Sequence, residues 1–313
     1  MSLSEFALIE RYFTGNKITN SHVRLGVGDD CALLAVSEGY ELAVTMDTMV
    51  EGVHFFSDVA PEDLGYKLLA VNLSDLASMG AEPVAVTLAL TLPKVDTNWL
   101  ERFVEGFGKL ARSYNVDLVG GDTTRGPLTL SLQAMGFVPV GKSLQRSGAK
   151  PGDLIYVTNR IGDAGLGLKI AKGDYDAGAE NEKVLQQFNR PVPRIVEGIK
   201  IRDYATSCID LSDGLLADLK HILEASHVGA CISWEQIPFS KAVHCYIKET
   251  GDWQMPVNAG DDYELCFTVN PEKAELIDID CYQIGFIETG SSLKLNKVGL
   301  IQEIVSYGFE HFY

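Results

Sequence analysis

The first half of the chain alternates between two patterns of hydrophobic and polar residues. Apolar and β-branched residues dominate the segments predicted as strands, which are residues 42–46, 84–92, 116–119 and 129–138. Apolar residues recur at helical spacing in the two segments predicted as helices, residues 61–79 and 98–114. Strands that alternate with helices of this length are typical of an α/β domain.

A second domain is expected after a stretch rich in glycine and proline at residues 141–153, which leads into a new predicted strand at 154–158. We place the boundary near residue 145, giving an N-terminal α/β domain, 1–145, and a C-terminal α/β domain, 146–313. The other elements predicted in the second domain are helices at 163–172, 194–203 and 212–226 and strands near Cys208 and at 265–269 and 282–287.

The chain is acidic and has no candidate membrane segment. Its 313 residues are 46% hydrophobic, which is enough to bury a core in about two domains. No apolar run of roughly 18 residues occurs, and residues 1–10 carry two glutamates and no basic residue, so neither a membrane span nor a secretory signal is predicted. A cytoplasmic location is expected. The net charge of −17 argues against nucleic acid or an anionic membrane as a partner.

The cysteines do not predict a metal site or a disulfide framework. The six of them never form a C-x-x-C pair, and most have apolar neighbours, so they are interpreted as reduced core residues.

One segment formally matches a phosphate-binding P-loop. The residues from Gly136 to Ser143 satisfy G-x-x-x-x-G-K-[ST], but Pro139 has no N–H to offer a phosphate, and the sequence after Lys142 does not favour a helix. We interpret the segment as the end of a strand that runs into the interdomain linker.

Several aspartates stand beside glycine, serine or threonine at the ends of apolar segments. Asp30 follows a turn permitted by Gly28, and Asp47 ends a predicted strand between the hydroxyls of Thr45 and Thr48. Carboxylate and carbonyl oxygens are the ligands that Mg²⁺ prefers. Each of these aspartates alone would more simply be a turn or cap residue, so the hypothesis of a metal site rests on their number.

Asp75 is harder to explain as a surface residue. At 100° per residue, Leu64, Leu68, Val71 and Asp75 fall within one narrow stripe of the predicted helix. An unpaired buried carboxylate is unfavourable, so Asp75 should have either a cation or a set of hydrogen-bond donors, and the periodicity leaves both open.

Three more acidic clusters lie farther along the chain. Asp122 follows Gly120 and Gly121 after a predicted strand, in an expected glycine turn that suits close approach to a phosphate. Asp210, Ser212 and Asp213 stand between a strand and a helix, for which Ser212 is the predicted N-cap. Asp261 follows Gly260 in a turn before the strand at 265–269. Turns and caps alone would account for most of these residues.

Among the six histidines no Ser-His-Asp or Cys-His arrangement stands out. His54 follows Asp47 closely on a segment that contains Gly52. A lone histidine is more often structural than functional, so its role stays open on the residues alone.

Taken together, these segments resemble thiamine-monophosphate kinase, over nearly the whole chain and in order. The segments that carry the resemblance are Gly28-Asp-Asp-Cys-Ala, Asp47-Thr48, Gly52-Val-His-Phe, Ala70-Val-Asn-Leu-Ser-Asp-Leu-Ala-Ser-Met-Gly-Ala, Gly120-Gly-Asp-Thr-Thr-Arg-Gly-Pro, Arg146-Ser-Gly-Ala-Lys-Pro-Gly-Asp, Ile209-Asp-Leu-Ser-Asp-Gly and Asp262-Tyr-Glu-Leu-Cys-Phe. The Asp-Gly elements also fit the wider superfamily of aminoimidazole ribonucleotide synthetase and selenophosphate synthetase. The resemblance implies a two-domain fold of that superfamily whose N-terminal domain dimerises through its sheet.

The resemblance also implies roles for individual residues. The Mg²⁺ shell would be Asp30, Thr45, Met46 through its carbonyl, Asp47, Asp75, Asp122, Asp210 and Asp213, with Asp30, Asp47, Asp75, Asp122 and Asp213 forming the catalytic carboxylates. Residues in contact with ATP would be Gly121, Asp122, Arg146 and Ser212, and residues in contact with thiamine monophosphate would be His54, Asp261 and Phe309. The resembling family usually has Gly-Glu-Asp where this chain has Gly260-Asp261-Asp262.

The implied reaction is the transfer of a phosphoryl group from ATP to thiamine monophosphate, giving ADP and thiamine diphosphate in the presence of several Mg²⁺ ions. A phosphate monoester is largely ionised at neutral pH, so the acceptor needs no strong base, and positioning and charge neutralisation are the main tasks. Two alternatives stay open, another ATP-using enzyme of the superfamily and a non-catalytic Mg²⁺-nucleotide-binding protein. A requirement for a monovalent cation is also left open.

Overall fold

The computed structural model describes residues 5–14 and 18–304, and their contacts divide the chain into two compact units. The first unit runs to Leu76 and from Ala81 to Gly141, and the second contains Ala77–Gly80 and the chain from Lys142 onward. Each unit contains its own sheet with helices, so the predicted α/β class is confirmed. The described residues include no helix that is both long and apolar enough to cross a membrane.

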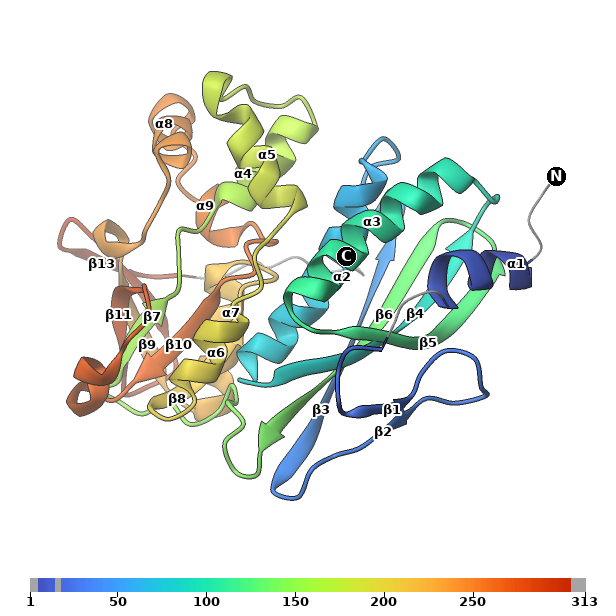
Figure 1. The fold of residues 1–313 in the computed structure, drawn as a ribbon. Coiled ribbons are helices and arrows are strands. Elements are labelled where there is room, and N and C mark those ends of the chain that lie inside the picture. Colours follow the sequence, from blue (N-terminus) through green and yellow to red (C-terminus); the bar gives the residue numbers. More distant parts are fainter. Residues whose placement is uncertain (1–4, 15–17, 305–313) are drawn as a thin grey trace. The chain divides into compact units, whose positions relative to one another are not determined.

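The first unit is built on a four-stranded sheet in the order β3-β6-β4-β5 (Figure 1). Its elements are α1 (Glu5–Ile9), the π-helix η1 (Glu10–Thr14), β1 (Val23–Leu25), β2 (Leu33–Leu34), β3 (Tyr40–Val50), α2 (Pro61–Ser78), β4 (Glu82–Leu92), α3 (Thr97–Ser113), β5 (Asp117–Arg125) and β6 (Thr129–Pro139). Strand β6 is antiparallel to both β3 and β4, whereas β4 and β5 are parallel and are joined through α3. Parallel strands require such a crossover connection.

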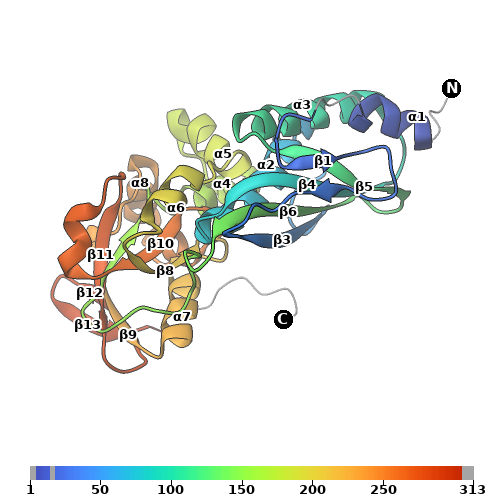
Figure 2. The same ribbon diagram turned by 60° about the horizontal axis from the view of Figure 1, so that its bottom comes forward.

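Helices α2 and α3 lie on the same side of this sheet (Figure 2). Leu68, Phe103 and Leu132, from the two helices and from β6, are fully buried. The two helices approach closely at Gly106, where a Cβ atom would meet the carbonyl oxygen of Glu62 at 1.9 Å. This close contact fixes the position of α2 relative to α3. It therefore also fixes the residues of α2 that approach β3.

The opposite face of the sheet is partly open along its edge strand β3. The side chains of Tyr40, Leu42, Val44 and Met46 alternate along β3 and are 43–60% exposed. Farther from this edge, Val23 of β1 packs against Phe137 and Ala85 and covers that part of the face.

The second unit is built on a seven-stranded sheet in the order β13-β12-β9-β11-β7-β10-β8, in which only β12 and β9 pair in parallel. Its elements are β7 (Leu154–Val157), α4 (Asp163–Ala171), η2 (Gly178–Glu180), α5 (Asn181–Asn189), α6 (Ile195–Ile201), β8 (Ala205–Asp210), α7 (Leu215–Ser226), β9 (Gly229–Ser233), η3 (Trp234–Gln236), α8 (Lys241–Thr250), α9 (Met255–Asn258), β10 (Leu265–Val269), η4 (Pro271–Leu276), β11 (Tyr282–Glu288), β12 (Leu293–Lys297) and β13 (Leu300–Glu303). Its core is an apolar cluster that includes Leu219 and Ile155.

Three local predictions need correction. Asp47 does not end a strand, because β3 continues to Val50. The glycines before Asp122 do not form a turn, because β5 continues through them to Arg125 with one irregularity in its pairing with β4. The helix expected from Ser212 begins only at Leu215, and Gly214 is its N-cap. The rejection of the P-loop is confirmed, because strand β6 runs to Pro139 and no helix starts at Lys142.

Gly121 should be essential to the pairing of β5 with β4. It has φ +151°, and a Cβ atom there would lie 1.9 Å from the carbonyl oxygen of Leu88 in β4. We therefore expect Gly121→Ala to lower the free energy of unfolding by about 2 kcal/mol or more, because the backbone must shift. Urea denaturation measures this loss.

Gly120→Ala is the matched control. A Cβ atom at Gly120 would meet only the Cγ2 atom of Thr87, at 3.7 Å, which is an ordinary contact. This variant should change the stability by less than about 1 kcal/mol. Equal losses in the two variants would show that close approach at Gly121 is not what distinguishes the two glycines.

Candidate active site

Two carboxylates meet between β3 and α2 in the first unit. The Oγ1 atom of Thr45 donates a hydrogen bond to Oδ2 of Asp75, so Thr45 and its neighbour but one, Asp47, face α2. All three side chains are half-buried. Burial and the charge of Asp75 raise the pKa of Asp47 from its ordinary value of 3.8 to about 7. The helical periodicity had placed Asp75 on the inner face, and the structure gives it a hydroxyl donor there.

The Thr45, Asp47 and Asp75 side chains, hereafter the β3–α2 cluster, fit a hard divalent cation. They offer carboxylate and hydroxyl oxygens, and burial together with the charge of Asp75 makes a second negative charge on Asp47 unfavourable, which a cation would offset. Met46 lies between Thr45 and Asp47 with its side chain 60% exposed, so only its backbone would suit such an ion.

Asp122 lies on the other edge of the same sheet. Asp122 of β5 belongs to a row of paired residues that crosses the whole sheet. It pairs with Ala89 of β4, Ala89 pairs with Ser131 of β6, and Ser131 pairs with Thr48 of β3. The hydroxyls of Thr48 and Ser131 are 2.7 Å apart, which confirms that this row of side chains shares one face. Asp47 belongs to the neighbouring row and therefore to the opposite face.

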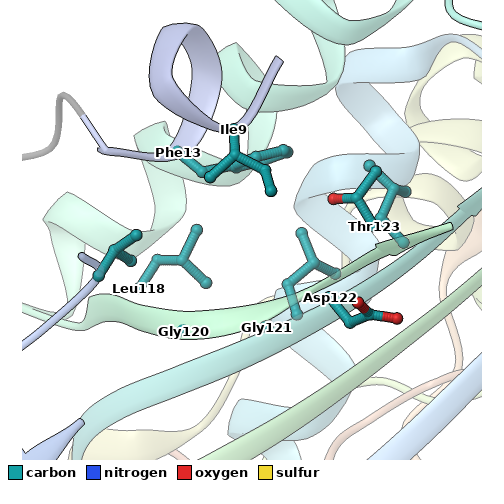
Figure 3. A pocket seen from close by; sticks show the side chains of 10 residues that line it. Ile9, Phe13, Leu118, Gly120, Gly121, Asp122 and Thr123 are labelled. Carbon is teal, nitrogen blue, oxygen red and sulfur yellow. The ribbon is translucent and has the colours of Figure 1, made fainter. Parts of the chain in front are cut away.

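A small pocket lies beside Gly121 on the helix-covered side of β5. Ile9 and Phe13 of α1 and η1 form one wall, and leucines of β4 and β5 form another (Figure 3). The residues that line it are Ile9, Phe13, Val27, Leu88, Leu90, Leu118, Gly120, Gly121, Asp122 and Thr123. The glycines leave backbone accessible next to an apolar wall.

Asp30 and His54 lie on loops of the first unit. Asp30 is exposed between β1 and β2, and its backbone N–H donates to Oδ1 of Asp29 at 2.8 Å. Nδ1 of His54 accepts the backbone N–H of Val50 at 3.0 Å. Because Nδ1 is the acceptor, the proton of the neutral ring is on Nε2, which makes that atom a donor suited to a phosphate oxygen.

Asp210, Ser212 and Asp213 lie between β8 and α7 of the second unit. Asp210 is 4% exposed at the end of β8, and Ser212 and Asp213 are half-buried. Ser212 does not cap the helix. The carboxylate of Asp218, inside α7, instead accepts the N–H groups of Asp213 and Gly214 at 3.0 and 3.1 Å. The two N–H groups that immediately precede this helix are therefore already used.

Sequence reasoning missed Asp218. It is 2% exposed, and burial raises its pKa to about 7 even though it accepts two backbone hydrogen bonds. The signal was present, because Asp218 falls on the same helical face as Leu215 and Ile222, which is the periodicity that singled out Asp75.

The segment from Gly260 to Glu264 is firmly anchored beside this strand end. The N–H of Asp261 donates to the carbonyl of Ser212 at 2.9 Å, and the hydroxyl of Tyr263 donates to Oδ1 of Asp261 at 3.0 Å. Asp261 has φ +70°, a conformation in which Asp is better tolerated than most residues. The loop thus holds Asp261 beside Ser212.

Two acidic side chains, one half-buried and one buried, complete this anchoring. The carboxylate of Asp262 accepts the N–H groups of Gly162 and Ala164 at the start of α4, at 2.7 and 3.2 Å. Glu264 is 4% exposed and accepts two hydrogen bonds of 2.6 Å from the guanidinium of Arg194. A bidentate buried pair of this kind strongly restricts the position of the loop.

Arg146 and Phe309 are the remaining residues that we predicted to contact ATP or thiamine monophosphate. Arg146 is exposed in the second unit, and its carbonyl accepts the hydroxyl of Ser226 at 3.3 Å. Its charge lowers the pKa of Asp218, although burial has the larger, opposite effect. Phe309 lies outside the described residues.

Within each unit the structure brings together some of the predicted site residues. It joins Thr45, Asp47 and Asp75 in the first unit, and Ser212 and Asp261 in the second. Among residues 5–14 and 18–304, no three His, Cys, Asp or Glu side chains form a ready metal-binding group. All six cysteines are free, as expected of reduced residues, but only Cys208, Cys231 and Cys266 are buried, so the expectation of core positions is wrong for Cys31 and Cys245, which are exposed.

Comparison with known families accounts for both units. The family model described as AIR synthase related protein, N-terminal domain, matches residues 28–138, and its C-terminal counterpart matches residues 150–295. The fold and these matches define an AIR synthase-related protein with two domains.

The relatives identify the branch of this family. Thiamine-monophosphate kinase of Escherichia coli (strain K12) is 47% identical over 287 residues, covering 91% of this chain and 88% of that protein. The crystal structure of thiamine-monophosphate kinase from Stenotrophomonas maltophilia K279a is 41% identical with a TM-score of 0.85, covering 95% of this chain and 98% of that chain. A structure described as AaThiL complexed with AMPPCP and TMP is 27% identical with a TM-score of 0.81, covering 100% and 99%. The chain belongs to the thiamine-monophosphate kinase family.

The raised pKa of Asp47 predicts a pH-dependent effect of Asp47→Asn on stability. As the pH rises from about 4, the unfolded chain releases this proton first, so the folded wild type loses stability until the pH passes about 7. We expect Asp47→Asn to remove that loss. The variant should match the wild type near pH 4 and be more stable at pH 8, by at most roughly 4 kcal/mol.

Urea denaturation in the presence of a chelator at both pH values checks this difference. Asp58→Asn, at an exposed loop position of the same unit, is the control and should behave as the wild type at both. A stability difference between Asp47→Asn and wild type that does not change with pH would contradict the raised pKa.

Proposed function

We propose that this protein transfers the γ-phosphoryl group of ATP to the phosphate of thiamine monophosphate, giving ADP and thiamine diphosphate. The observation that carries the proposal is the β3–α2 cluster, whose two carboxylates and hydroxyl would suit a cation, in a chain whose relatives are named thiamine-monophosphate kinase. The relative described with AMPPCP and TMP binds an ATP analogue and TMP, which supports ATP and thiamine monophosphate as the two substrates here.

Mg²⁺ would be held by Asp47 and Asp75 with the hydroxyl of Thr45, and Asp30, Asp122, Asp210 and Asp213 are proposed as further ligands. When bound, the ions would neutralise the charge of two phosphate groups that otherwise repel each other. Because the reaction consumes ATP, a cytoplasmic location fits it.

The side chains of the protein have simple tasks in this reaction. The acceptor phosphate is already largely ionised at neutral pH, so no residue has to remove a proton from it. Nε2–H of His54 is proposed to donate to the phosphate of thiamine monophosphate, because Nδ1 is held by Val50. Asp261, which the second unit holds beside Ser212, is proposed to orient thiamine monophosphate. Arg146 and Gly121 are proposed to contact ATP.

The direct test is to incubate the protein with ATP, Mg²⁺ and thiamine monophosphate and to separate the thiamine phosphates by chromatography. Thiamine diphosphate should accumulate together with an equal amount of ADP. ADP formation that does not depend on thiamine monophosphate would contradict the proposal and favour another ATP-using activity.

Asp47→Asn and Asp75→Asn should each lower kcat by about 10²- to 10³-fold, because each removes a charge that the reaction needs for neutralisation. Circular dichroism should show that both variants keep their secondary structure. Asp58→Asn again serves as the control and should keep full activity. Near-normal turnover of both cluster variants at saturating Mg²⁺ would mean that these carboxylates are structural.

We also propose that the chain forms a homodimer through the sheet of its first unit. The alternating exposed side chains of Leu42, Val44 and Met46 on edge strand β3 support this interface, because such an apolar edge is commonly covered by another chain. Sedimentation should give about twice the chain mass of 34.2 kDa.

A charged residue on this stripe should separate the dimer. Val44 is 53% exposed, so Val44→Lys should leave the fold of the unit intact while it lowers the sedimenting mass to that of one chain. Val298→Lys, at an 82% exposed site of the second unit, is the control and should remain a dimer. A dimer that survives Val44→Lys would place the interface elsewhere.

A further inference from the structure

The segment that joins β8 to α7 carries Ser212 and Asp213, which are proposed to act on ATP and Mg²⁺ (Figure 1). Its residues, 211–214, belong to neither a strand nor a helix. The regular hydrogen bonds of secondary structure therefore do not fix the backbone from which the Asp213 carboxylate projects, and other contacts have to do so.

The loop before β10 holds the first half of this segment. The N–H groups of Tyr263 and Asp261 donate to the carbonyls of Leu211 and Ser212, at 2.8 and 2.9 Å. A Cβ atom at Gly260 would lie 2.0 Å from the carbonyl oxygen of Ser212, so the two backbones are in direct contact there. The loop thereby fixes the chain up to Ser212.

The second half of the segment is held from inside the helix. Oδ2 of Asp218 accepts the N–H of Asp213 at 3.0 Å and the N–H of Gly214 at 3.1 Å. Asp218 is 2% exposed, and Leu219 and Ile222 of the same helix are fully buried in the core of the unit. A carboxylate anchored in a closely packed core has little freedom, so the two N–H groups that it accepts have little freedom either.

The chain turns sharply directly after Asp213. Gly214 has φ +112°, and a Cβ atom there would lie 2.7 Å from the carbonyl carbon of Asn258, so only glycine is accommodated. Because Asp carries its carboxylate on a single methylene, the position of the Asp213 carboxylate follows this backbone closely. Mg²⁺ requires nearly octahedral geometry with ligands at about 2.1 Å, so it tolerates little displacement of a ligand.

We propose that Asp218 is a positioning residue for the reaction, because its carboxylate holds the backbone of Asp213 and so sets the geometry in which the Asp213 carboxylate meets Mg²⁺. This inference rests on the proposed function. It goes beyond that function by adding a residue that acts through a ligand and not on the ion itself. If Asp218 only stabilised the start of α7, its removal would lower the free energy of unfolding without changing the binding of Mg²⁺.

Two substitutions of Asp218 separate its hydrogen bonds from its charge. Asp218→Ala removes the acceptor of both N–H groups and should weaken Mg²⁺ binding about tenfold, as the loss of a group that orients a metal ligand commonly does. Asp218→Asn loses the charge but keeps an oxygen acceptor with the same reach, so its Mg²⁺ affinity should stay within about threefold of the wild type. Calorimetric titration of Mg²⁺ measures both affinities without turnover.

Ile222→Val is the control for a general loss of stability. It removes one methyl group from a fully buried position one turn farther along α7. It should lower the urea midpoint but leave the Mg²⁺ affinity within about twofold of the wild type. Circular dichroism checks that each variant folds. Asp218→Ser, which keeps a polar atom in this buried place but lacks the carboxylate oxygens, takes the place of Asp218→Ala if the alanine variant does not fold.

A double-mutant cycle tests whether Asp218 acts through Asp213. Asp213→Asn alone should weaken Mg²⁺ binding, because it removes a charged ligand. Adding Asp218→Ala to Asp213→Asn should weaken the affinity by less than about twofold more, whereas the same substitution costs about tenfold when Asp213 is present.

Three results would overturn the proposal. They are an unchanged Mg²⁺ affinity of Asp218→Ala, an equal loss in Asp218→Ala and Asp218→Asn, and a full tenfold loss when Asp218→Ala is added to Asp213→Asn. A different result concerns the proposed function alone. Wild type that shows the expected differences in Mg²⁺ affinity from these variants, but makes no thiamine diphosphate, would refute that function and support the positioning role of Asp218.

Discussion

The structure of the candidate site depends on one unfavourable contact, the approach of the Asp47 and Asp75 carboxylates beneath helix α2. Burial of Asp47 between the helix and the sheet and, to a smaller extent, repulsion by Asp75 raise the pKa of Asp47 to about 7. The protein maintains this contact because α2 is fixed on the sheet by apolar packing of residues such as Leu68 and Leu73, both fully buried. The hydroxyl of Thr45 satisfies Asp75 but adds no positive charge. A cation is the component that would make the arrangement favourable.

The acidic side chains inside the second unit have a different environment. The inward carboxylates of this unit are satisfied by protein donors, with buried Asp218 and half-buried Asp262 accepting backbone N–H groups and buried Glu264 accepting hydrogen bonds from the guanidinium of Arg194. These groups stiffen the segments that carry Asp213 and Asp261. The contrast between the units distinguishes acidic residues that hold the backbone in place from Asp47 and Asp75, which we propose bind a cation.

Much of the fold could be predicted from the sequence, because α3 has strong apolar periodicity and α2, β4 and β6 are long segments rich in apolar residues. Asp75 was found for the same reason, since a carboxylate on an apolar helical stripe is a clear signal. The extensions of β3 and β5 were missed because Asp47, Gly120 and Gly121 have low strand propensity, and tertiary pairing with β6 and β4 overrides it. The start of α7 was misplaced because Asp218, four residues beyond Gly214, takes the role expected of Ser212.

The arrangement of the site residues could not be predicted, because it depends on strand order. The sequence suggests one shell of carboxylates, whereas insertion of β6 between β3 and β4 moves Asp47 and Asp122 to opposite edges. The resemblance supplied the residue roles but contained no information on which of them one chain brings together. The backbone conformation of Asp261 could not be predicted either, because its φ of +70° is set by the surrounding loop, although Asp adopts this region more readily than most residues.

The claim that the Asp47 and Asp75 pair is a cation site can be measured through the proton that Asp47 holds. Calorimetric titration of Mg²⁺ into the protein at pH 7, in two buffers with different enthalpies of ionisation, gives the number of protons released on binding. With a pKa of about 7, Asp47 is about half protonated, so the wild type should release about half a proton more than Asp47→Asn. Equal proton release by the two proteins would contradict the account and would mean that Mg²⁺ binds without displacing a proton from this carboxylate.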